Sequence, residues 1–340
     1  MEPNFFEIAR SQFLQNHFFV WLLNWANDEN KDLSKELNEI AKDFVRLLLG
    51  EKSDFPIKNV KAVGQWNNID IKVAVNDEYI IAINNKLSDT CFTTQLMDYK
   101  IQINEHYPTK KNKFIYLITK NDDWYYYSGI KDLSFDIVNR QMILDFMNKQ
   151  RTDNDIFNDY KDYLNKIEIE TNSFNKYHNI ITNSYAAEGF YLKLKNIIME
   201  KNLLAMWEYD SDINGDFLKF YYYDLYKIEN IGMLFIQLEN HINGSDIQLN
   251  IKICQWEPST DNLQKIFNEI KPIAEKNGLY VVKPNKYIVD HESTVAIVPN
   301  LIKTDNDDNI DWTAFLRTLE KLEKTIDEYN EGKISLLEPD

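Results

Sequence analysis

The chain has 340 residues, of which 44% are hydrophobic and 14% aromatic, enough apolar material for about two domains with buried cores. It lacks any apolar run of the roughly 18 residues that a membrane span needs, and it lacks the basic and apolar start of a signal peptide. We therefore expect a cytoplasmic protein with no membrane partner. Cys91 and Cys254 are the two cysteines, so we predict no disulfide framework and expect both to be small core residues.

The formal net charge of −16 argues against broad, non-specific binding of nucleic acid, which needs Lys and Arg facing phosphate. Segment 86–151 is an exception, with ten Lys and Arg against eight Asp and Glu. It holds the basic cluster Lys110-Lys111-Asn112-Lys113. This cluster fits either an ordinary solvated surface or a patch that faces phosphate, and the charge count alone does not separate the two.

Two helices are predicted at the start of the chain. Residues 4–25 are aromatic and helical in pattern, and residues 32–49 repeat apolar side chains at helical spacing, with Gly50 directly after them. Glycine just beyond the last periodic residue is a helix stop. The apolar stripe of the second helix is expected to be core.

A β-hairpin is predicted next. Residues 69–75 alternate apolar and other side chains, Asn76-Asp77 is a turn signal, and residues 79–83 form a second β-rich run. This places Asp70 on one strand, and Asn84 and Lys86 two residues apart on one face of the next.

A helix after the hairpin is expected to carry Gln95 and Tyr99 on one face, because they are four residues apart. Polar groups placed beside apolar runs in this way indicate a site rather than a core. Segment 113–118 supplies a further strand.

This layout resembles the PD-(D/E)XK nuclease superfamily, in which an Asp and then a Glu-x-Lys lie on adjacent strands. A Gln-x-x-x-Tyr helix follows in the RecB-like branch. Asp70, Lys86 and Gln95-Leu-Met-Asp-Tyr99 match that pattern, whereas the Glu position holds Asn84. The resemblance covers roughly residues 10–150 and implies an α/β, restriction-endonuclease-like core, with a mixed sheet flanked by helices.

The resemblance also implies a chemistry and a cofactor. Nucleases of this superfamily hydrolyse phosphodiester bonds with Mg²⁺ or Mn²⁺, cations that prefer oxygen ligands. It assigns Asp70, Asn84 and the Asn85 carbonyl as metal ligands. Lys86 would act on the attacking water and the phosphorus, while Gln95 and Tyr99 would hold the lysine and the backbone of a nucleic acid, expected to be DNA.

The amide at position 84 removes one negative charge from such a site. Three explanations compete: a naturally degenerate relative, an introduced substitution, or a missing acid supplied by the following helix, where Asp98 is the nearest candidate. Two functions therefore follow. The first is a metal-dependent nuclease in bacterial defence or DNA processing, impaired by Asn84. The second is a catalytically inactive nuclease fold that binds nucleic acid or a protein partner.

The N-terminal helix adds to the resemblance. His17-Phe-Phe-Val-Trp-Leu-Leu23 is similar to the entry helix of one branch of the superfamily. Related enzymes often have a metal-assisting acid near this point, where this chain has Gln15 and Asn16. His17 is either a surface histidine or part of the wall of the site.

The rest of the first domain, residues 1–170, is predicted as an aromatic strand or loop at 124–127 and helices at 134–150 and 153–167. The tyrosines of the aromatic segment suit core packing, with base stacking as the alternative. The sequence has no Gly-rich phosphate loop and no Cys/His zinc spacing.

The second domain, residues 171–340, is predicted as an α+β accessory unit. It follows a polar boundary at 172–183 and carries no catalytic signature. A helix at 184–201 precedes an antiparallel meander. The sequence allows this domain to bind a protein partner, and it allows the chain to self-associate. The predicted strands are 204–209, 216–226, 231–239 and 246–254, followed by helices at 259–277 and 311–331 and short strands at 279–283 and 294–299.

Overall fold

The computed structural model describes residues 4–8, 12–86, 93–120, 127–201, 205–212, 215–228, 231–241 and 247–334. The chain divides into two compact units, Met1–Glu168 and Ile169–Asp340. This division lies within two residues of the predicted boundary. In the part of the chain that is described, no helix is both long enough and apolar enough to cross a membrane.

The first unit is built on a mixed five-stranded sheet with the order β1-β2-β3-β4-β5. Strands β1 to β3 are antiparallel neighbours, whereas β3, β4 and β5 run parallel. The predicted mixed sheet flanked by helices is therefore confirmed at this level. The strands are β1 (Val60–Trp66), β2 (Ile69–Val75), β3 (Tyr79–Lys86), β4 (Lys111–Ile118) and β5 (Asp136–Asn139).

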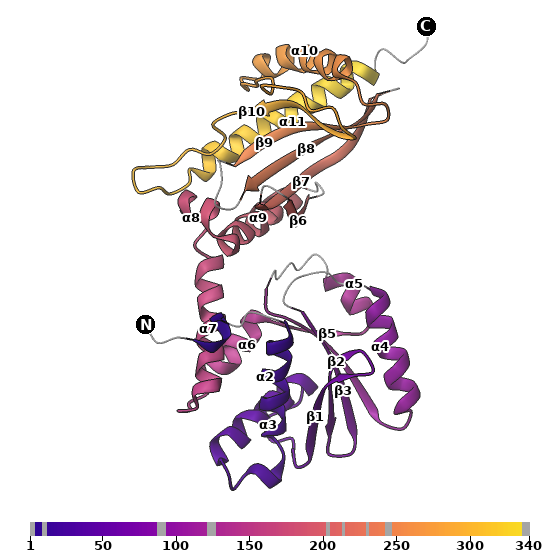
Figure 1. The fold of residues 1–340 in the computed structure, drawn as a ribbon, viewed down its shortest axis with the longest axis vertical. Coiled ribbons are helices and arrows are strands. Elements are labelled where there is room, and N and C mark those ends of the chain that lie inside the picture. The colour runs from indigo at the N-terminus through magenta and orange to yellow at the C-terminus, as the bar shows by residue number, and fades with distance from the viewer. Residues whose placement is uncertain are drawn as a thin grey trace. The chain divides into compact units, whose positions relative to one another are not determined.

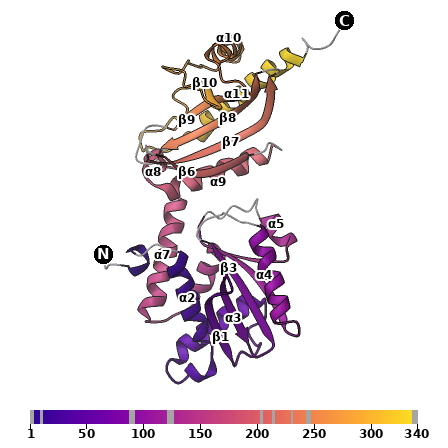
Figure 2. The same cartoon turned by 45° about the vertical axis from the view of Figure 1, so that its right-hand side comes forward.

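Helices cover both faces of this sheet (Figure 1). One face is covered by helix α2 (Gln12–Asn24), and α3 (Lys35–Leu49) packs against α2. The other face is covered by α4 (Thr93–His106). Figure 2 shows the same layers from a second direction. The remaining helices of this region are α1 (Phe5–Ile8), the 3-10 helix Asp28–Asn30, α5 (Tyr127–Asp132), α6 (Arg140–Met147) and α7 (Asp155–Thr171).

Local sequence explains the predicted boundaries. Asn76 and Asp77 adopt φ values of 51° and 57°, the left-handed conformation that a two-residue hairpin turn requires, and both residue types tolerate it. Ser34 caps the start of α3 through its side chain, and Gly50 ends the helix with φ 75°. The hairpin and the glycine stop are both confirmed.

Two predictions for the first unit are wrong, and one strand was missed. Segment 134–150 is not one helix, because Asp136–Asn139 pairs with β4 as strand β5, and the Asn139 side chain then caps α6 by accepting the Met142 N–H. Strand β1 was not predicted. Tyr127 begins helix α5 instead of lying in a strand or loop, while 124–126 lie outside the described residues.

The second unit contains the predicted meander. Strands β6 to β9 are consecutive antiparallel neighbours, and β10 joins the outer side of β9 in a sheet of order β10-β9-β8-β7-β6. The predicted strand at 279–283 is wrong, because only an isolated bridge joins Val282 to Ile297. The strands are β6 (Ala205–Asp212), β7 (Gly215–Ile228), β8 (Gly232–His241), β9 (Gln248–Gln255) and β10 (Glu292–Val298).

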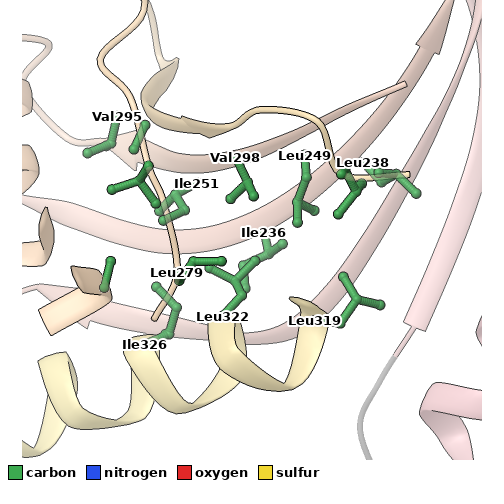
Figure 3. Close-up of a cluster of buried hydrophobic side chains, with 14 of the residues drawn as sticks. Ile236, Leu238, Leu249, Ile251, Leu279, Val295, Val298, Leu319, Leu322 and Ile326 are labelled. Carbon is green, nitrogen blue, oxygen red and sulfur yellow. The ribbon is translucent and has the colours of Figure 1, made fainter. Parts of the chain in front are cut away.

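Helices α8 (Tyr177–Thr182), α9 (Ser184–Met199), α10 (Thr260–Lys276) and α11 (Trp312–Ile334) complete this unit. Leu319, Leu322 and Ile326 of α11 pack on apolar side chains of the sheet (Figure 3). This burial supplies the main stabilising term for the unit. Cys254, expected in the core, is only half-buried, and Cys91 lies outside the described residues.

Candidate functional site

Asp70, Asn84 and Lys86 share one face of the first sheet. Strands β2 and β3 pair Lys72 with Ala82, and continuing this antiparallel register by two residues sets Asp70 opposite Asn84. Side chains two residues apart point to the same face, so Lys86 lies on this face as well. Helix α4 covers this face and brings Gln95 and Tyr99 to it.

The Asp70 carboxylate is held by several donors. Its Oδ2 accepts the backbone N–H of Asn85 at 3.0 Å and the side-chain Nδ2 of Asn84 at 3.4 Å. The backbone N–H of Asp70 donates to the Tyr99 hydroxyl at 3.0 Å. Asp70 is only 8% exposed, and Tyr99 and Asn84 are buried. A buried carboxylate with this many donors is a fixed, preorganised group.

Lys86 is held from the helix side. Its Nζ donates to Oε1 of Gln95 at 3.0 Å, and its positive charge acts on the Asp70 carboxyl. Gln95 and Tyr99, four residues apart, therefore contact the lysine and the aspartate respectively. All five predicted side chains thus converge on one place.

Burial is the largest influence on the pKa values of Asp70 and Tyr99. It raises the pKa of the Asp70 carboxyl, although the Asn85 N–H, the Lys86 charge and the Tyr99 and Gln65 side chains all act to lower that pKa. Burial, with a further contribution from the Asp70 charge, also raises the pKa of the Tyr99 hydroxyl well above its ordinary value. Tyr99 therefore stays a neutral hydrogen-bonding group across the physiological pH range.

The side-chain oxygen of Asn84 lacks a hydrogen-bond partner among the described residues. Asn84 turns its Nδ2 toward Asp70, and its Oδ1 is buried. A buried acceptor without a partner costs about 1–3 kcal/mol. Such a group is explained by a ligand, a water or an ion that completes it.

A buried amide network lies behind the site, on the side of the sheet covered by α2. The Asn85 side chain accepts from Gln15 Nε2 at 2.5 Å and donates to Asn16 Oδ1. Gln15 Oε1 in turn accepts the hydroxyls of Thr119 at 2.7 Å and Tyr160 at 3.1 Å. Sequence reasoning noted Gln15 and Asn16 only as the place of a missing acid. It missed their contact with Asn85, whose N–H holds Asp70.

Two other candidates lie outside the cluster. Asp98 is exposed on α4, and no contact described for this chain joins it to Asp70, Asn84 or Lys86. His17 is exposed, and its Nδ1 lies 2.7 Å from the backbone oxygen of Phe13, one helical turn away. His17 is therefore a surface histidine, which agrees with the first interpretation and not with a place in the wall of the site.

The basic cluster also lies away from the site. Strands β3 and β4 pair Tyr79 with Lys111 at one end and Lys86 with Ile118 at the other. Seven residues of strand separate the two ends by about 23 Å. Each lysine of the cluster is paired with an acid: Lys110 with Asp77 at 2.9 Å, Lys111 with Glu78 at 2.5 Å, and Lys113 with Asp136. These contacts favour a solvated surface over a phosphate-facing patch.

The donor atoms suit a hard divalent cation in type but not in charge. The Asp70 carboxylate and the unpaired Asn84 Oδ1 are both oxygens, the ligand atoms that Mg²⁺ and Mn²⁺ prefer. Only one of the two is charged, and the described residues contain no group of three or more His, Cys, Asp or Glu side chains that could hold a metal ion. A cation would therefore bind weakly here.

Comparison with known proteins identifies no relative: no family model, no curated protein and no solved structure matches the chain.

Proposed function

We propose that the first unit is a metal-dependent nuclease site of the PD-(D/E)XK type with a weakened metal centre. The observation that carries this proposal is the convergence of Asp70, Asn84 and Lys86 under Gln95 and Tyr99 of α4. An acid on one strand, a lysine on the next and a Gln-x-x-x-Tyr helix over both is the arrangement that the superfamily uses for phosphodiester hydrolysis.

The side chains have distinct roles in this proposal. Asp70, the Asn84 Oδ1 and the Asn85 carbonyl would hold Mg²⁺ or Mn²⁺, which supplies an acidified water and offsets negative charge. Lys86, oriented by Gln95, places a positive charge beside the scissile phosphate. Tyr99 fixes the β2 backbone at Asp70. The substrate class is nucleic acid, with DNA expected.

A cleavage assay tests the proposal. Labelled single- and double-stranded DNA and RNA are incubated with the protein and Mg²⁺ or Mn²⁺, with EDTA as the blank. Asp70→Asn and Lys86→Met should each lower any cleavage by at least about 10²-fold. Lys110→Met, at the other end of the sheet, should leave the rate unchanged. Cleavage that survives both site variants would rule the proposal out.

A second function is favoured by one specific contact. The Asn84 amide donates to Asp70, so the amide nitrogen stands where the family glutamate would add negative charge. Under this alternative the chain is an inactive nuclease fold that binds nucleic acid or a protein partner, with the second unit available for a partner or for self-association. Nucleic-acid binding that is unaffected by EDTA, without cleavage in any metal, would support it.

A further inference from the structure

Gln65, in strand β1, has an unusual backbone conformation. Its φ is +52°, in the left-handed region where the Cβ of an L-residue crowds the following carbonyl oxygen. Among the described residues with positive φ other than glycine, all but Gln65 and Ser134 are Asn or Asp, the types that tolerate this region best. The conformation of Gln65 is therefore strained.

Turn chemistry does not explain this strain. Asn67 and Asn68 have φ values of 47° and 64° because they are the two central residues of the β1–β2 hairpin turn, which requires positive φ. Gln65 lies before that turn, inside the strand. The pairs Gly64–Ile71 and Trp66–Ile69 on either side of it keep a single register, so no inserted bulge residue accounts for its conformation either.

The position of Gln65 points to the site. Gln65 lies between Gly64 and Trp66, and the pairing of these two with Ile71 and Ile69 sets Gln65 opposite Asp70 across the β1–β2 pair. The Gln65 residue is exposed, whereas Asp70 is buried. Hydrogen bonding by the Gln65 side chain acts to lower the pKa of the Asp70 carboxyl. Residues held in strained backbone cluster at active sites and ligand clamps, and Gln65 lies beside the buried carboxylate of the candidate site.

We propose that Gln65 is a positioning residue for Asp70, kept in a strained conformation so that its amide orients the carboxylate from the solvent side. This inference rests on the proposed nuclease function for its consequence in catalysis. The position of Gln65 opposite Asp70, and the strain, stand without that function. The contact between the two side chains is tested separately.

The strain is tested by two glycine substitutions in the same hairpin. Gln65→Gly removes the Cβ that makes a positive φ costly, and Asn68→Gly does the same at a turn position where glycine is favoured. Both variants should unfold at a higher temperature than the wild type, by roughly 2–8 °C. A Gln65→Gly protein that is no more stable than the wild type would overturn the claim of strain.

The contact is tested by NMR at fixed pH, with the Asp70 carboxyl ¹³C signal assigned through Asp70→Asn. That signal should move in Gln65→Gly and stay in place in Asn68→Gly. If both variants leave it unchanged, Gln65 does not position Asp70. Neither this measurement nor the unfolding temperature needs an active enzyme.

The catalytic consequence is tested by Mn²⁺ titration and DNA cleavage. Loss of a group that orients a metal ligand typically costs about 10–100-fold in affinity or activity, and Gln65→Gly should lose this much while Asn68→Gly loses nothing. Gln65→Asn, which keeps the amide, should recover part of the loss. A wild type that neither binds Mn²⁺ nor cleaves refutes the proposed function. If the wild type binds Mn²⁺ and cleaves DNA, and Gln65→Gly does both equally well, the role of Gln65 is refuted.

Discussion

At the scale of single residues, Asn84 sets the chemistry that the site can perform. An amide and a carboxylate have nearly the same shape, but the amide contributes a neutral oxygen and a donor. The donor is directed at Asp70, so the amide stabilises that carboxylate and leaves a cation only one neutral oxygen from residue 84. One carboxylate next to Lys86 leaves little net negative charge for a divalent ion.

Asn84→Glu should therefore raise Mg²⁺- or Mn²⁺-dependent cleavage of DNA. The substitution adds a second carboxylate opposite Asp70, and a well-placed group of this kind is typically worth about 10²–10³-fold in rate. Cleavage of a labelled duplex and calorimetric titration with Mn²⁺ measure the gain. The side chain is one methylene longer, so Asn84→Asp serves as the shorter control.

Adding Lys86→Ala to Asn84→Glu should abolish the gain, because the lysine acts on the same phosphate. An Asn84→Glu protein that binds Mn²⁺ no better than the wild type would show that this face of the sheet is not a metal site. The second function, binding without cleavage, would then be the better account.

Asp98 was the alternative source of the second acid, and its exposed position on α4 argues against that role. We expect Asp98→Ala to change neither Mn²⁺ affinity nor cleavage, in the wild type or in Asn84→Glu. A loss of activity of tenfold or more in the same assays would reverse this assignment.

At the scale of elements, the hairpin and the α4 helix could be predicted from sequence because their signals are local. Alternation in 69–75, the Asn76-Asp77 turn and the four-residue spacing of Gln95 and Tyr99 each depend on neighbouring residues only. Since a hairpin fixes which residues face each other, the convergence of Asp70, Asn84 and Lys86 followed from the same signals.

Features that depend on tertiary contacts were not predictable. Strand β5 has four residues and is defined by its pairing with β4, so the apolar spacing of 134–150 resembled one helix. The Asn139 cap was the local signal that marked the true start of α6. The link from Gln15 to Asn85 spans 70 residues, and the positive φ of Gln65 has no signature in its own sequence.

The glycine that ends α3 gives a test at this scale. Gly50→Ala should destabilise the first unit by about 1–2 kcal/mol, because alanine is strained at φ 75°. The added Cβ would meet nothing closer than Lys113 Nζ at 4.0 Å, so strain and not a clash is the cause. The denaturant midpoint reports the change.

Gly129→Ala, in helix α5, is the matched control. Its Cβ would meet nothing within 4 Å, and its φ is not positive, so alanine should be neutral or stabilising by roughly 0.5–1 kcal/mol. Equal effects at both glycines would contradict the explanation based on φ.

Helix α11 carries two glutamates with opposite pH dependence. Burial raises the pKa of Glu323, despite the opposing charge of Lys201, so its ionised form destabilises the fold above that pKa. Glu323→Gln should therefore raise the unfolding temperature at pH 7. The difference should shrink on acidification and vanish below the unfolded-state value of about 4.3.

Glu328 should behave in the reverse sense, because a hydrogen bond from Lys276 lowers its pKa. Its stabilising contribution is present above the unfolded-state pKa and is lost as the pH falls through the folded-state pKa. Glu328→Gln should thus lower the unfolding temperature at pH 7 and have no effect in acid. Thermal unfolding of both variants between pH 3 and pH 8 is the measurement, and shifts of the same sign would contradict this assignment.

At the scale of the whole molecule, charge opposes the binding of nucleic acid. The chain carries −16, and the basic cluster at Lys110–Lys113 is paired with acids at the end of the sheet remote from Lys86. The lysines of the sheet nearest the site are Lys86 at the end of β3, Lys72 two residues from Asp70 on β2, and Lys120 two residues after the end of β4. Any nucleic-acid contact would therefore rest on few cations.

The salt dependence of binding measures how many lysines contact the phosphates of a nucleic acid. Each neutralised phosphate contributes about 0.7–0.9 to the slope of log K against log salt, so three lysines give a slope no steeper than about −3. Fluorescence anisotropy with a labelled oligonucleotide over a salt series measures it. Lys86→Ala should make the slope shallower by about 1, whereas Lys110→Ala with Lys111→Ala should leave it unchanged, because those lysines lie about 23 Å away along the strands. A slope that responds to the Lys110 and Lys111 substitutions and not to Lys86 would place the nucleic acid on the opposite end of the sheet, and Asp70 would then have no phosphate to act on.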